Sequence, residues 1–111
     1  MSDTQAIKVL IADDEPGMRL ILRKMIARVE GYELVGEAQD GIEALRKIKN
    51  TDCDVMLLDM NMPGRSGIDL LADIKALKPK MHILVLSIHP EDKFALRTLK
   101  AGASGYLCKD T

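Results

Sequence analysis

Short aliphatic runs alternate with longer segments of helical periodicity along almost the whole chain of 111 residues. Aliphatic runs of about four to eight residues between turn-forming residues are typical of buried strands, whereas apolar residues three and four positions apart predict amphipathic helices. A strand, a helix and a second strand in succession form the unit of a parallel sheet. The sequence therefore predicts a doubly wound α/β fold with parallel strands at residues 9–12, 34–37, 55–58, 83–86 and 106–108.

The second of the intervening helices has a start signal that resembles a capping box. Asp40 suits the N-cap position, and Glu43 follows three residues later, which is the spacing of a capping box. The apolar residues that follow have helical spacing, so we expect them to face the core. These residues are Ile42, Leu45 and Ile48.

A doubly wound sheet needs helices over both of its faces, but only Asp110 and Thr111 follow Lys109. We therefore expect residues 1–111 to form one domain that lacks the final helix of its fold. Exposed apolar patches larger than roughly a few hundred Å² usually mark an association surface. The uncovered face accordingly predicts self-association of the chain.

Composition excludes several classes of function. The net charge is −1 and aromatic residues make up 3% of the chain, so we expect no direct binding of nucleic acid. The start of the chain is polar, and no apolar run reaches the roughly 18 residues that span a bilayer, which predicts a cytoplasmic protein without membrane contact. Cys53 and Cys108 are isolated from other metal-ligating residues, so we expect two reduced thiols.

Polar residues lie at the carboxyl ends of four of the predicted strands. In open parallel sheets, ligands bind beyond the carboxyl ends of the strands. Asp13 and Asp14 end the first strand, Asp59 the third, Ser87 the fourth, and Lys109 the fifth. Carboxylates that share a site repel one another unless a cation neutralises them, and Mg²⁺ prefers oxygen ligands of this kind. The pattern predicts a magnesium site suited to phosphoryl transfer.

In such a site each side chain has a distinct task. Asp59 is the expected nucleophile, while the ammonium group of Lys109 and the hydroxyl of Ser87 can hold phosphoryl oxygens. Each residue also has a simpler explanation. The Asp13–Asp14 pair and Ser87 could cap helices, Asp59 could form a turn, and Lys109 could be a solvated surface charge. Their common location at strand ends favours the joint site.

Three sequence runs resemble a known family in their order and spacing. These are VLIADDE at residues 9–15, LLDMNMPG at 57–64 and KAGASGYLCK at 100–109. The chain thereby resembles the receiver domains of response regulators, in the CheY-like superfamily, from Ile7 to Lys109. The resemblance implies a flavodoxin-like sheet with strand order 2-1-3-4-5 and a sensor histidine kinase as phosphoryl donor.

The resemblance also implies roles for individual residues. Asp59 would accept the phosphoryl group, Asp14 would bind Mg²⁺ directly, Asp13 would bind it through water, and Asn61 would offer its backbone carbonyl. Ser87 would be the switch hydroxyl, Lys109 the residue that binds the phosphoryl oxygens, and Tyr106 the switch aromatic. The positions expected to tune dephosphorylation are Asn61, Ile88 and His89.

One departure from the family pattern points to a subfamily. Asp110 follows Lys109 where many receivers have proline, which resembles receivers that precede a LuxR-type helix-turn-helix domain. Such a domain, which would link phosphorylation to transcription, is not in this sequence.

Two other classes of function stay open. One is an aspartyl-phosphate hydrolase resembling the haloacid-dehalogenase phosphatases, but these carry a second acidic residue two positions after the nucleophile, where this chain has Asn61. The other is an interaction module whose carboxylates never accept phosphate. We expect a phosphoacceptor and not a multiple-turnover enzyme.

Overall fold

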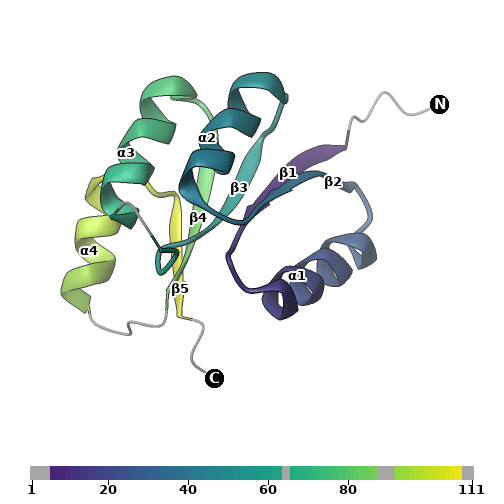
Figure 1. The fold of residues 1–111 in the computed structure, drawn as a ribbon, viewed down its shortest axis with the longest axis horizontal. Helices are drawn as coiled ribbons and strands as arrows, with labels where there is room; N and C mark the ends of the chain where they lie inside the picture. Colours follow the sequence, from purple (N-terminus) through teal and green to yellow (C-terminus); the bar gives the residue numbers. More distant parts are fainter. Residues whose placement is uncertain (1–5, 64–65, 88–91, 109–111) are drawn as a thin grey trace.

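The computed structural model describes residues 6–63, 66–87 and 92–108, which form a parallel sheet with helices between the strands (Figure 1). The sheet has five strands in the order β2-β1-β3-β4-β5, which confirms the predicted flavodoxin-like topology. Each predicted strand lies within an observed one. In chain order the elements are β1 (Ile7–Ala12), α1 (Pro16–Arg28), β2 (Tyr32–Ala38), α2 (Gly41–Asn50), β3 (Val55–Asp59), α3 (Gly67–Leu77), β4 (His82–Ser87), α4 (Asp92–Lys100) and β5 (Gly105–Cys108).

Most residues of the central strands β1, β3 and β4 are apolar because both faces of the sheet are covered near its middle. Helices α2, α3 and α4 lie on one face, and α1 lies on the other (Figure 1). The larger core, between the sheet and α2 and α3, contains the fully buried side chains of Leu58, Leu71 and Ile74. The smaller core lies under α1, where Leu22 and Ile26 pack on the sheet.

The face that carries α1 is only partly covered in the described part of the chain. No helix follows β5 among these residues. Ile21 and Met25 on α1 are 53% and 57% exposed, and Leu107 on β5 is 52% exposed. Leu107 pairs in register with Leu86, which belongs to the smaller core, so it lies on the same face as that core. Apolar side chains therefore remain in contact with solvent there.

Helix α2 begins as predicted but packs with a different rotation. The backbone N–H of Glu43 donates to Asp40 Oδ1 over 2.8 Å, which confirms the N-cap. Ile42, however, is 67% exposed, so its predicted place in the core was wrong. The reason is that Gly41 faces α3, where an added Cβ would lie 3.2 Å from Leu70 Cδ2. The buried positions of α2 are Gly41, Ala44 and Ile48.

No helix in the described ranges is both long and apolar enough to cross a bilayer.

The two isoleucines of α2 give a matched test of this packing. Replacing the fully buried Ile48 with alanine should lower the free energy of unfolding by about 2–5 kcal/mol, because it removes core contacts and leaves a cavity. Replacing the exposed Ile42 with alanine should change it by no more than about 0.5 kcal/mol. Urea unfolding followed by circular dichroism measures both, and equal losses would contradict the observed rotation of the helix.

Candidate acidic site at the carboxyl edge of the sheet

Two buried aspartates lie where β1 and β3 end. Ala12, the last residue of β1, pairs with Leu58 of β3, so Asp13 and Asp59 follow side by side at one edge of the sheet. Asp14 comes next and is more accessible to solvent. Carboxylate oxygens from Asp13, Asp14 and Asp59 all lie within 4.8 Å of one another. The fold thus brings together the three acidic side chains that the sequence analysis had grouped.

The two buried carboxylates are held in the same way. Asp13 Oδ1 accepts a hydrogen bond from the backbone N–H of Glu15 over 2.9 Å. Asp59 Oδ1 accepts one from the backbone N–H of Asn61, also over 2.9 Å. These are Asx turns, in which an aspartate binds the backbone two residues further on. One oxygen of each carboxylate is therefore fixed by the turn that follows its strand.

The chemistry of this group suits a hard divalent cation. Three carboxylates at such short separations repel one another, and burial of two of them increases the cost of their charge. Mg²⁺ offsets this repulsion and is usually bound by one or two carboxylates together with water and phosphate oxygens. Asp13, Asp14 and Asp59 supply carboxylate ligands, and the partial exposure of Asp14 gives water and phosphate oxygens access to the same site.

The remaining predicted residues lie partly within the structure. Ser87 ends β4 and is fully buried, and it follows Leu86, which pairs with Asp59, so it lies at the same edge as the acidic group. Tyr106 pairs with Val85 and is partly buried against the larger core, two register positions before the Ser87–Cys108 pair at that edge. The other predicted residues lie outside the described residues: Lys109, Ile88 and His89.

A network of charges beside the acidic group was not foreseen from the sequence. Arg19 Nη1 donates to the backbone carbonyl of Asp13 over 2.6 Å, and its Nε lies 3.4 Å from Glu37 Oε1. Arg23 binds both oxygens of Glu37, at 2.7 and 3.0 Å. Lys47 donates to the backbone carbonyl of Glu37. The basic residues of α1 are visible in the sequence, but only the pairing of β2 with β1 shows which of them meet a carboxylate.

These cations change the acidity of Glu37. Hydrogen bonds from Arg23 are the main reason that the pKa of Glu37 is lowered from its ordinary value of 4.5. The positive charges of Arg23, Arg19 and Lys47 act in the same direction, while burial opposes them.

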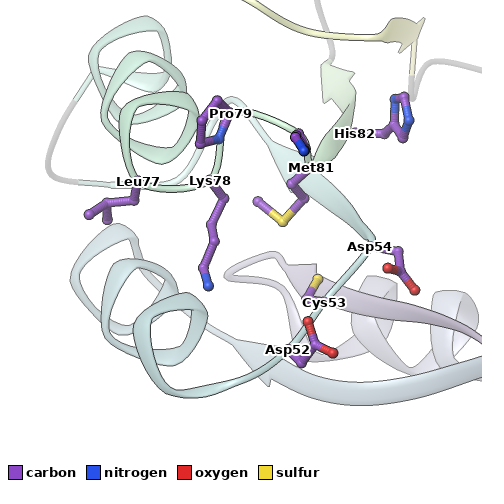
Figure 2. Close-up of a pocket in the computed structure, with 9 residues that line it drawn as sticks. Asp52, Cys53, Asp54, Leu77, Lys78, Pro79, Met81 and His82 are labelled. Carbon is purple, nitrogen blue, oxygen red and sulfur yellow. The ribbon is translucent and has the colours of Figure 1, made fainter.

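A groove of about 560 Å³ lies at the opposite edge, where β3 and β4 begin. Figure 2 shows Asp52 and Cys53 on one side of it and Lys78 and Pro79 on the other. Burial raises the pKa of the Cys53 thiol, and neither Cys53 nor Cys108 forms a disulfide, as predicted. This groove is separated from the acidic group by the length of the strands.

The fold and the acidic group together define a class of protein, a flavodoxin-like α/β domain with a carboxylate pocket at the carboxyl ends of β1 and β3. Residues 9–111 match the family described as the response regulator receiver domain. The chain belongs to this family.

Three related proteins show the extent of the similarity. GacA, a response regulator of Pseudomonas syringae pv. syringae, is 36% identical over 93% of this chain and 48% of its own length. A LuxR-family response regulator from Aurantimonas sp. SI85-9A1 is 34% identical, with a TM-score of 0.89 over 96% of this chain and 76% of its own. RcsB of Salmonella enterica serovar Typhimurium was solved bound to promoter rprA in the presence of phosphomimetic BeF3- and is 29% identical to this chain. The two structures have a TM-score of 0.87, and the similar region covers 95% of this chain and 61% of the RcsB chain. The chain thus spans about half the length of the curated relative.

The lowered pKa of Glu37 predicts a pH-dependent contribution to stability. A carboxyl whose pKa is lower in the folded than in the unfolded state stabilises the fold above its unfolded pKa, and this contribution disappears as the pH falls through the folded pKa. Glu37→Gln should therefore lower the urea midpoint of unfolding at pH 7, and the difference from the wild type should shrink as the pH falls below 4.5. A difference that stays constant over this range would show that the ion pairs of Glu37 contribute nothing to stability.

Proposed function

We propose that this chain is the phosphoacceptor domain of a two-component response regulator, and that Asp59 receives a phosphoryl group from a sensor histidine kinase. The observation that carries the proposal is the placement of a buried Asp59 within 4.8 Å of the carboxylates of Asp13 and Asp14. Membership of the receiver family supports it.

In this proposal Asp14, Asp59 and the backbone carbonyl of Asn61 would hold Mg²⁺ directly, and Asp13 would hold it through water. Bound Mg²⁺ neutralises charge that develops on the phosphoryl oxygens during transfer. An Asp59 oxygen attacks the phosphorus of the kinase phosphohistidine, the phosphorus–nitrogen bond breaks, and the imidazole leaves. The Asx turn at Asp59 orients the carboxylate before the donor arrives.

The product is an acyl phosphate that changes the charge at this edge of the sheet. A phosphoryl group adds negative charge and acceptor oxygens, which attract the Ser87 hydroxyl and the Lys109 ammonium group. Tyr106 would follow the movement of Ser87, so that β4, α4 and β5 form the output face. The lifetime of the phosphorylated state would depend on Asn61, Ile88 and His89, and the domain would lose its own phosphoryl group without turning over external substrates.

The relatives indicate what the switch would control. The similar proteins include a LuxR-family regulator and a protein solved on promoter DNA. We infer that residues 1–111 act as the receiver domain of a transcription regulator, with DNA contacts made by a separate domain and not by this one.

The phosphoacceptor role is tested by Phos-tag electrophoresis after incubation with acetyl phosphate and Mg²⁺. The wild type should show a shifted band that disappears in Asp59→Asn and when EDTA removes the cation. Asp54→Asn is the matched control, because Asp54 directly precedes the same strand at the opposite edge of the sheet, and it should shift like the wild type. Borohydride trapping and tandem mass spectrometry should locate the modified carboxylate at Asp59.

The other outcomes separate the alternatives. A band that persists in Asp59→Asn would overturn the assignment of the acceptor. Multiple turnover of external phosphate esters would favour a hydrolase, and the absence of any shift with acetyl phosphate or with a phosphorylated kinase would favour an interaction module.

We further propose that the partly covered face beside α1 associates with a second copy of this chain. The exposed side chains of Ile21, Met25 and Leu107 would leave water on association. Size-exclusion chromatography over a series of protein concentrations should show a monomer–oligomer equilibrium, and Met25→Lys should shift it towards the monomer. A monomer at every concentration would exclude this proposal.

A further inference from the structure

Arg19 joins the acidic turn to the neighbouring strand. We propose that Arg19, held by Glu37, is a positioning residue that sets the affinity of the acidic group for Mg²⁺. The inference rests on the proposed function, because it assumes that the carboxylates of Asp13, Asp14 and Asp59 bind this cation.

Arg19 supplies one of the described hydrogen bonds that hold Asp13. The backbone N–H of Asp13 donates to the carbonyl of Ala38 over 3.0 Å, and its carboxylate accepts from the N–H of Glu15. The guanidinium of Arg19 binds the backbone carbonyl of Asp13 over 2.6 Å. This carbonyl belongs to the peptide that joins Asp13 to Asp14, so Arg19 fixes the relative orientation of the two carboxylates.

Glu37 determines where the guanidinium of Arg19 lies. The Nε of Arg19 is 3.4 Å from Glu37 Oε1, while its Nη1 reaches the carbonyl of Asp13. The planar guanidinium can make both contacts at once because its donors are fixed in a fork, which a lysine cannot reproduce. The side chains of Arg19 and Glu37 are only 18% and 23% exposed, so both are screened from solvent more than a typical surface pair.

The charge of Arg19 and its hydrogen bond to Asp13 should have opposite effects on Mg²⁺ affinity. The measured affinity of a variant therefore shows which effect is larger. The positive charge of Arg19 repels a cation in the adjacent pocket, so removing the charge alone would strengthen Mg²⁺ binding. Loss of the hydrogen bond to Asp13 would instead loosen the ligands and weaken binding. Groups that orient metal ligands typically change affinity by about 10–100-fold when they are removed. We therefore expect the loss of positioning to dominate.

Calorimetric titration with Mg²⁺ alone measures the affinity without any phosphodonor. Arg19→Met should weaken binding by about tenfold, the lower end of the range for such orienting groups. Arg19→Lys keeps the charge and one donor group, so it should restore part of the affinity. Glu37→Gln should weaken binding less than Arg19→Met, and the double variant should bind no more weakly than Arg19→Met, because the two residues act through one contact.

Arg23→Met is the matched control. Arg23 lies on the same helix and pairs with the same carboxylate, but its described contacts are with Glu37 and not with the acidic turn. This variant should lose thermal stability and keep the Mg²⁺ affinity of the wild type. Circular dichroism confirms that each variant is folded, and if Arg19→Met fails to fold, Arg19→Lys and Glu37→Gln provide the test.

The outcomes distinguish this inference from the proposed function. If the wild type binds no Mg²⁺, or if Asp59→Asn binds it as tightly as the wild type, the proposed magnesium site is wrong and the role of Arg19 falls with it. If the wild type binds Mg²⁺ and folded Arg19→Met binds it equally or more tightly, only the positioning role is wrong. Equal weakening in Arg23→Met would also overturn it, because a general loss of stability would then explain the effect.

Discussion

Mutual repulsion among three carboxylates at one edge of a parallel sheet is the constraint on which the rest of this structure depends. The register between β1 and β3 makes the approach of Asp13 and Asp59 unavoidable, because their preceding residues are paired. Sheet hydrogen bonds and core packing supply the free energy that holds these charges together. A group of carboxylates of this kind favours a divalent cation, which offsets their repulsion and would also neutralise negative charge on a phosphoryl group beside it.

The two hydrophobic cores pack against opposite faces of the sheet that carries this site. The larger core packs α2 and α3 against the face of β3 that carries Leu58, so the strand that ends in Asp59 is anchored along its length. Ser87 ends the neighbouring strand β4 and is fully buried. Within the described residues, the face that carries α1 leaves the apolar side chains of Ile21, Met25 and Leu107 exposed.

Much of the fold could be predicted from the sequence because strands and helices differ in the periodicity of their apolar residues. Polar residues at the ends of the predicted strands indicated where the site lies. The clustering of Asp13, Asp14 and Asp59 followed from parallel topology alone. The rotation of α2 could not be predicted, because the close approach of Gly41 to Leu70 depends on packing between helices distant in sequence. Roles assigned to Lys109, Ile88 and His89 stay predictions, since these residues lie outside those that the structure describes.

The network around Glu37 shows how the proposed Mg²⁺ site would depend on a helix that supplies no ligand to it. Leu22 and Ile26 bury the inner side of α1 against the sheet, and this packing fixes the rotation of the helix. Arg19 lies three residues before Leu22, close to the same side, so the packing that buries Leu22 also directs the guanidinium towards the acidic turn. Apolar contacts under α1 and the orientation of the Asp13 carbonyl are thus parts of one arrangement. A binding event that shifted α1 on the sheet would move Arg19 and, through it, the peptide between the first two aspartates.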